Sequence, residues 1–438
     1  MILAHGIGGR VDLPLPPWQM AWAAAFAVAS SFVVLGAFWE RPHLAAWSRG
    51  RMLLRDGLVT RLVVGIARSV GLAWFGLVLY AAWRGNENGF VNIAGTWLFI
   101  WFWVGFQLVS VVIGDVWRLF NPFFTVADAA AWVRARLTGT GMSAADHGEG
   151  DNWPAVAAIF SFLWFELAYH SNDSPRSIGL YLTLYSAAML GGAAVRGRGW
   201  VRSADGFGVL FSKLSAMAPL YHDDVDGGLR IRPPLAGLAG LPVVAGTVPF
   251  ILTVLGSTTF DGFTAGSIWL DIADDRIGWS ATLVNTIGLV FIILVVGLAY
   301  RLAVMAMAAI TGERDLDLFD AFGPSLVPIA AAYAIAHYFS LLVLEGQAIF
   351  IQISDPFGRG EDWFGTVDHS IDWTAISPST IAWTQTVAIA VGHMLAVVAA
   401  HDRAVERYEH RLAVRSQYPM LGVMIAYTVV GLLILLKA

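Results

Sequence analysis

The sequence predicts an all-α membrane protein, a polytopic bundle of about ten transmembrane helices. Hydrophobic residues make up 57% of its 438 residues and charged residues only 13%. The mean hydropathy is +0.64. Soluble domains usually carry about 25% charged residues, so the composition excludes a large soluble enzyme. The net charge of −5 gives no basis for binding nucleic acid.

Ten apolar segments have roughly the 17–25 residues that cross a hydrocarbon core. They are 18–39, 62–83, 93–113, 153–170, 177–195, 241–260, 281–310, 323–345, 380–401 and 419–436. The 45 Gly and 19 Trp fit this interpretation. Gly lets helices pack closely in a membrane, and Trp favours the membrane interface.

The basic residues predict the orientation, because cytoplasmic loops are enriched in Lys and Arg. With the N-terminus outside, all but six of the 27 basic residues fall on the inner side. The six outer ones are Arg10, Arg84, Arg176, Arg276, Arg359 and Lys437. We therefore expect a multi-pass protein with both termini extracytoplasmic.

The loops on the two sides differ in composition. The outer loops 257–280 and 346–379 are acidic, and such loops raise the local concentration of cations. On the inner side, 43–55, 125–138 and 200–218 mix aromatic residues or Leu with Arg or Lys. This mixture predicts helices that lie at the membrane surface. Solvated loops and plain connectors are the alternatives.

Short strings recur in the same order in the two halves of the chain. VGLAW at 70–74 matches VGLAY at 296–300, and NPF at 121–123 matches DPF at 355–357. The pattern predicts a duplication. Because five spans per half is an odd number, the second half would be inverted, as in many secondary transporters.

The duplication predicts four regions. They are an extracytoplasmic strap at 1–17, a first five-span repeat at 18–195, a cytoplasmic connector with an interfacial helix at 196–240, and a second five-span repeat at 241–438. In the sixth span, Gly246, Pro249 and Gly256 would either interrupt the helix, as in transporter binding helices, or only kink it.

Ionisable residues fall inside the predicted spans, where they usually line a pathway or bind something. His337 lies near the middle of 323–345, and His393 lies near the middle of the antiparallel span 380–401. Two imidazoles at this depth can share a proton, a water or a metal. Glu166 and His170 are four residues apart, which places them on one helix face in the outer half of the bundle.

Further polar residues extend this candidate pathway. Glu345 ends its span at the outer edge, and Gln385 lies at membrane depth. His5 precedes the first span in a Gly-rich strap that would fold over the outer mouth together with Asp12. The candidate proton or substrate pathway is thus His337, His393, Glu166, His170, Glu345 and Gln385. The candidate metal ligands are His337, His393, His170 and His5.

The absence of cysteine limits the cofactors. It excludes disulfides, Cys-ligated zinc, iron–sulfur clusters and covalently attached c-type haem. A transition metal or haem b held by histidine stays open.

The strings HGIGGRVDLPLP, FGPSLVPIAAAYAIAHYFSLLVLEGQ and GHMLAVVAAHDRA resemble a family of multi-span bacterial membrane proteins that is common in actinobacteria. Some members of this family are labelled fenitrothion hydrolase. The resemblance runs through the whole chain and implies the bacterial cytoplasmic membrane as its location. The label implies metal-assisted hydrolysis of phosphotriesters.

These observations favour an integral membrane transporter or channel for a small solute or cation, with the midplane histidines as binding or proton-relay groups. One alternative is a membrane-embedded metal- or haem-dependent enzyme, an oxidoreductase or a hydrolase. The other is a structural subunit of a membrane complex. The expected partners are the lipid bilayer and a small solute or cation, and a homo-oligomer or larger complex stays open.

Overall fold

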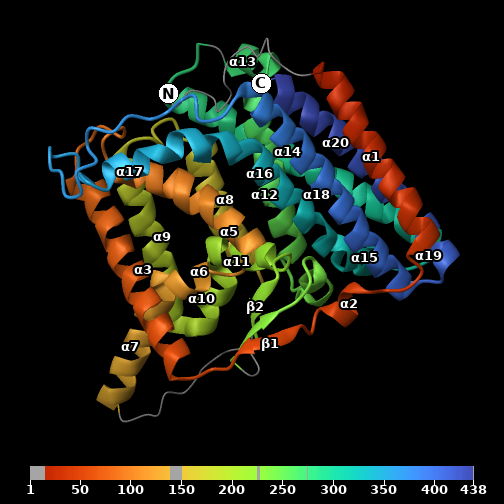
Figure 1. Ribbon diagram of the computed structural model, residues 1–438, viewed down its shortest axis with the longest axis horizontal. Coiled ribbons are helices and arrows are strands. Elements are labelled where there is room, and N and C mark those ends of the chain that lie inside the picture. The colour runs from red at the N-terminus through yellow and green to blue at the C-terminus, as the bar shows by residue number, and fades with distance from the viewer. Residues whose placement is uncertain (1–14, 139–149, 224–226, 274, 438) are drawn as a thin grey trace.

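The computed structural model describes residues 15–138, 150–223, 227–273 and 275–437, and it is a helical bundle (Figure 1). The helices of the first half are α1 (Pro17–Phe38), α2 (Leu44–Trp47), α3 (Leu58–Arg84), α4 (Ile93–Gly95), the π-helix η1 (Thr96–Gly105), α5 (Phe106–Val112), α6 (Trp117–Phe120), α7 (Pro122–Thr138), α8 (Trp153–Leu167), α9 (Pro175–Arg196), α10 (Arg198–Ala204) and α11 (Gly206–Ser215).

The second half continues this helical pattern. Its helices are the 3₁₀ turn η2 (Ala236–Gly240), α12 (Thr247–Thr264), α13 (Ser267–Ala273), α14 (Trp279–Thr311), α15 (Asp315–Phe322), the 3₁₀ turn η3 (Gly323–Leu326), α16 (Val327–Leu344), the 3₁₀ turn η4 (Glu345–Gln347), α17 (Ala348–Gln352), α18 (Pro378–Arg407), α19 (His410–Ser416) and α20 (Tyr418–Lys437). The predicted all-α class is therefore confirmed.

All ten predicted apolar segments are largely helical. Within the described part of the chain, eight helical stretches are long and apolar enough to cross a membrane. They are Pro17–Phe38, Leu58–Arg84, Ile93–Val112, Pro175–Arg196, Trp279–Thr311, Asp315–Gln352, Pro378–Arg407 and His410–Leu436. The remaining two predicted spans correspond to α8, with 15 residues, and α12, with 18. The protein is thus membrane-embedded, and a count of ten spans stays a prediction.

The connections gather at two opposite ends of the bundle. Figure 1 shows the start of α1, the end of α20, α13 and α17 at one end, and the strands and α7 at the other. This separation matches the division between predicted outer and inner loops. The predicted outer loops lie beside the start of α1 and the end of α20, and the predicted connector lies opposite to them.

Which end faces the outside can be tested with single cysteines, since the chain has none of its own. Ser212 on α11 and Ser370 in the 346–379 loop are both exposed serines at opposite ends. We expect a membrane-impermeant maleimide to label Ser370→Cys in intact cells, and Ser212→Cys only after lysis. Labelling of both variants in intact cells would place residues 212 and 370 on the same side of the membrane. It would contradict the odd number of membrane crossings that is predicted between these residues.

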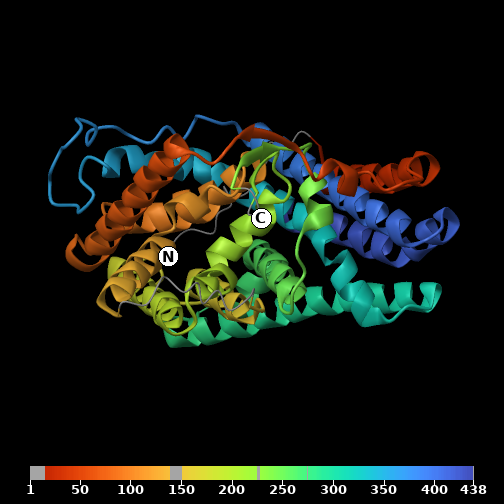
Figure 2. The same cartoon turned by 90° about the horizontal axis from the view of Figure 1, so that it is seen from below.

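The first helix packs against the end of the chain. Helix α1 contacts both α18 and α20, so segments far apart in sequence lie side by side. Seen from below, α14 lies along one edge of the molecule and α1 on the opposite side (Figure 2). Helix α12 lies inside the bundle, with fifteen of its 18 residues buried. A helix that is buried on nearly all sides can carry polar groups in contact with several neighbours at once.

The predicted inner end differs from the expected surface helices in two places. Residues 43–55 form only the short α2 and then strand β1 (Arg51–Leu54), because β1 pairs with β3 (Leu229–Ile231), which also pairs with β2 (Leu220–His222). Helix α11, within the expected surface helix 200–218, is mostly buried and packs on α5 and α8. Only α7 keeps the expected character, with Trp132, Val133 and Leu137 exposed.

A turn from the second half is bound to a turn of the first at the opposite end. The Asn86 amide nitrogen donates to the Phe357 carbonyl at 2.8 Å, and its side chain donates to the Gly358 carbonyl at 3.0 Å. The carboxylate of Asp355 accepts from the backbone nitrogens of Arg359 and Gly360. Within the predicted acidic loop, the Asp355 carboxylate therefore stabilises its own turn rather than attracting cations.

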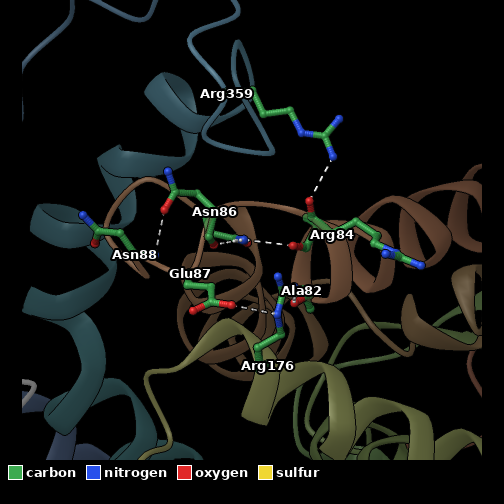
Figure 3. Close-up of polar contacts among 9 residues, drawn as sticks. Ala82, Arg84, Asn86, Glu87, Asn88, Arg176 and Arg359 are labelled. Carbon is green, nitrogen blue, oxygen red and sulfur yellow. Dashed lines mark hydrogen bonds and ion pairs between the residues drawn. The ribbon is translucent and has the colours of Figure 1, made fainter.

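Three of the six predicted outer cations lie in this contact, as Figure 3 shows. The Arg359 guanidinium donates to the Arg84 carbonyl at 2.9 Å. Arg176 donates to the Ala82 carbonyl at 2.8 Å and lies 3.4 Å from the Glu87 carboxylate. The Arg359 side chain thus connects the 355–360 turn to α3, and the Arg176 side chain connects α9 to α3, while Arg84 takes part through its backbone carbonyl. The turn joins the two halves of the chain at this end.

The residues that would be equivalent in a repeat have different surroundings. A Cβ on Gly71 would lie 2.0 Å from the Phe120 carbonyl, so α3 and α6 approach closely there, whereas one on Gly297 would meet nothing within 4 Å. Pro122 starts α7, while Pro356 lies in a turn. The duplication therefore stays a prediction.

Candidate functional site

A buried pair of ionisable side chains lies inside the bundle between α12 and α16. The Nε2 atom of His337 lies 2.8 Å from Oδ2 of Asp261, which is within ion-pair distance but without the geometry of a hydrogen bond, and the two side chains are only 9% and 11% exposed. The Tyr338 hydroxyl donates to the same carboxylate oxygen at 2.9 Å. A carboxylate beside an imidazole can hold one proton on either group, so the pair is a site for a proton or a cation.

Asp261 was not among the sequence-predicted site residues, because it was placed in the outer acidic loop. The sixth span was expected at 241–260, but 241–246 is not helical and Gly246 adopts a φ of +87°. Helix α12 instead runs from Thr247 to Thr264, so Asp261 belongs to the helix and not to the loop. The available signal was that Asp261 is the only charged residue between Phe250 and Phe263, a stretch that mixes apolar residues with Thr, Ser and Gly.

The expected interruption of this helix is wrong. Helix α12 is continuous from its first residue to its last. Gly246 precedes the helix and Pro249 lies in its first turn, where a missing backbone N–H costs little. Gly256 instead allows close packing, because a Cβ there would lie 2.5 Å from the Cα of Ile293 on α14.

Glu166 on α8 reaches the same region. Its carboxylate lies within electrostatic range of Asp261, and its Oε2 atom is buried without a hydrogen-bond partner among the described residues. His170 does not share this position, although four residues separate the two. Helix α8 ends at Leu167, so His170 lies beyond it, exposed, with Nδ1 2.9 Å from Oγ1 of Thr282. The spacing rule failed because the helix ends between the two residues.

His393 is fully buried on α18, which packs against α16. Its Nδ1 lies 2.8 Å from the Ile389 carbonyl and therefore donates, which leaves Nε2 as an acceptor with no partner in the described structure. His337 and His393 do not hydrogen-bond to each other. Two aromatic rings, Tyr333 and Tyr427, lie between them.

Neighbouring rings form a series from His337 through Tyr333 and Tyr427 to His393. The ring centroids are 6.5 Å apart for His337 and Tyr333, 6.3 Å for Tyr333 and Tyr427, and 6.0 Å for Tyr427 and His393. The Tyr427 hydroxyl is hydrogen-bonded to Thr259 on α12. A series of neighbouring ring contacts thus connects the two histidines through Tyr333 and Tyr427.

The remaining predicted residues lie at different depths. Gln385 is buried on α18, and Glu345 begins η4 as a half-buried residue. His5 and Asp12 lie outside the described residues. Among the residues that are described, no group of three or more His, Asp or Glu is arranged to hold a metal ion. The candidate ligands His337, His393 and His170 each have different neighbours.

Five buried polar atoms around α12 have no hydrogen-bond partner within the described part of the chain. They are Glu166 Oε2, both ring nitrogens of His337, the Tyr333 hydroxyl and His393 Nε2. More than about 90% of buried polar groups in folded proteins are satisfied, so such a cluster needs an explanation. Ionisable groups of this kind inside a membrane protein typically line a substrate or proton pathway.

Asp205 shows the opposite arrangement at the predicted inner end. Its buried carboxylate accepts from the Tyr185 hydroxyl at 2.6 Å, the Asn121 amide at 2.7 Å and the Trp117 indole at 3.2 Å. Burial raises the pKa of Asp205, and these three donors act in the opposite direction. A carboxylate with this many donors holds helices together, so Asp205 is a structural residue and a useful reference for Asp261.

Comparison with protein-family models, with curated proteins and with solved structures finds no match to this chain.

Proposed function

We propose that this chain is an integral membrane transporter that couples the movement of a small solute or cation to protons, with Asp261 and His337 as the proton-binding pair. The observation that carries the proposal is their 2.8 Å contact inside an apolar helical bundle. Burial of an isolated charge in such surroundings is costly. A carboxylate and an imidazole that share a proton avoid that cost while they remain able to exchange it.

The neighbouring groups support a pathway on both sides of this pair. Glu166 lies within electrostatic range of Asp261 and forms the outer branch. Tyr333, Tyr427 and His393 continue the polar region along α16, α20 and α18 toward the inner end. A solute or cation that enters from outside would displace the proton shared by Asp261 and His337. The net charge of this pair would change when the proton leaves.

The proposal includes two inverted five-span halves that move relative to each other. Each half contributes its first long helix to the other: α1 packs on α18 and α20, and α12 packs on α8. Such reciprocal packing is expected where two repeats enclose a central site. Asp261 and His337 belong to the second half and Glu166 to the first, so the site lies where the halves meet.

Proton movement in proteoliposomes tests this function. The purified protein is reconstituted with a trapped pH-sensitive dye, and gradients of Na⁺, K⁺, Mg²⁺, Ca²⁺, Mn²⁺, Zn²⁺, phosphate, amino acids and sugars are applied one at a time. We expect one of these gradients to change the internal pH, with no change in protein-free liposomes. A protein that moves no protons under any of these gradients contradicts the proposal.

The enzyme alternative makes a different prediction for the same preparation. A metal- or haem-dependent enzyme would carry a stoichiometric metal, and haem b would add a Soret absorption band. Elemental analysis and an absorption spectrum of the purified protein therefore separate the two functions independently of any transport assay.

A further inference from the structure

A second feature lies apart from the proton-binding pair, in the first half of the chain. It is a cavity of about 340 Å³ bounded by α3, η1, α5, α6, α7, α9 and α11. Its walls are largely aromatic and include Trp74, Trp97, Phe102, Phe106, Trp117 and Phe123. None of the groups of the candidate pathway lines it.

Two polar side chains of the lining are hydrogen-bonded elsewhere. The Tyr185 hydroxyl and the Trp117 indole both donate to Asp205, which accepts a further hydrogen bond from Asn121. The buried Trp74 indole nitrogen has no hydrogen-bond partner among the described residues. The surface toward the cavity is almost entirely apolar. Apolar cavities of this kind do not retain water and instead bind apolar molecules.

The position of Val70 shows where the cavity meets the surface. Val70 lines the cavity and is also 52% exposed, on the same face of α3 as the exposed Val63 and Ile66. Helix α3 is apolar along its 27 residues and is one of the candidate spans. Val70 lies about 18 Å from the start of this helix at 1.5 Å per residue, close to its middle. The cavity thus opens sideways at a depth where the surroundings are hydrocarbon.

We infer that this cavity binds one hydrocarbon chain of a bilayer phospholipid, which enters from the side of the bundle beside Val70. Three features fit this occupant: the apolar aromatic walls, the hydrogen bonds that engage the Tyr185 hydroxyl and the Trp117 indole with Asp205, and an opening at mid-membrane depth. Water-soluble ligands do not reach this depth, whereas acyl chains surround it. The bound chain would fill the space between α3 and η1 and hold both against α9 and α11.

Photocrosslinking tests the site with a defined probe. The protein is reconstituted with phosphatidylethanolamine that carries a diazirine in the middle of one acyl chain, and the adducts are mapped by mass spectrometry. We expect adducts on the segments around Trp74 and Phe102. Val70→Trp would block the opening, and we expect it to reduce these adducts at least fivefold.

Val63→Trp is the matched control, because Val63 is 55% exposed on the same helix, two turns away, and does not line the cavity. It should leave the cavity adducts unchanged. If Val70→Trp does not fold, Val70→Phe against Val63→Phe makes the same comparison. Adducts only on exposed surfaces, equal in all variants, would indicate ordinary surrounding lipid and overturn the inference. So would the retention of an isoprenoid quinone, rather than a phospholipid, by the delipidated protein.

Discussion

Asp261→Asn is expected to abolish coupled proton movement in proteoliposomes while the protein stays folded and inserted. Asn has nearly the shape of Asp, and its side-chain oxygen can still accept from the Tyr338 hydroxyl. It cannot bind a proton in the relevant range and brings no negative charge to His337. We expect the initial rate of proton movement to fall by about a hundredfold, the scale on which removal of a proton-transfer group acts in enzymes.

His337→Gln should produce the same loss, because it removes the other half of the pair. The double variant Asp261→Asn/His337→Gln should be no slower than either single variant. Groups that act as one unit are strongly non-additive, since the first substitution already removes the function of both. Independent losses that multiply in the double variant would show that the two residues act at separate sites.

Asp205→Asn provides the reference for a structural carboxylate. Asp205 is 1% exposed and Asp261 is 9% exposed, and three side chains donate to Asp205. Its substitution should lower stability by about 1.5–3 kcal/mol, the usual range for hydrogen bonds to a charged group. The transport rate per folded molecule should not change. If Asp261→Asn behaves like Asp205→Asn, with lower stability and normal transport, the proton-binding role is wrong.

The sequence predicted the helices well wherever an apolar run ended in charged residues. Helices α3, α9 and α14 lie within a few residues of the expected spans for this reason. The prediction failed at residues 241–246, which are apolar but not helical. Apolar composition identifies membrane depth without fixing the backbone conformation, so the start of α12 was placed six residues too early.

That displacement accounts for the main omission in the predicted site. An early start moved Asp261 from the interior of α12 into an apparent loop, although its pairing with His337 is the central contact. His337 and His393 were identified from their depth alone. Depth does not determine the direction in which a side chain leaves its helix, and two tyrosine rings lie between them. Glu166 was predicted from its position in an apolar run and from its four-residue spacing to His170, and only the first of these arguments holds.

The contact between α16 and α18 carries the second large prediction. Gly392 lies on α18 directly before His393, and a Cβ there would lie 2.0 Å from the Cβ of Ala332 and 2.9 Å from the Pro328 carbonyl. Gly392→Ala must therefore push α18 away from α16. Overpacking of this kind typically costs about 1–3 kcal/mol, and we expect the upper end because a helix backbone, rather than a flexible side chain, has to move.

Denaturation of the purified variants in mixed micelles measures this cost. Gly422→Ala is the matched control, since it is also a helical glycine but a Cβ there meets nothing within 4 Å. It should be neutral or stabilise by about 0.5–1 kcal/mol, because Ala favours helix over Gly. Removal of the opposing methyl in Gly392→Ala/Ala332→Gly should restore part of the lost stability. In Gly392→Ala, the separation of α16 from α18 should also move His393 away from Tyr427 and lower transport. The double variant removes this separation, so it should also recover transport. Equal stability of Gly392→Ala and Gly422→Ala would mean that these helices are not in close contact at this level, and the path from His337 to His393 would then lose its structural basis.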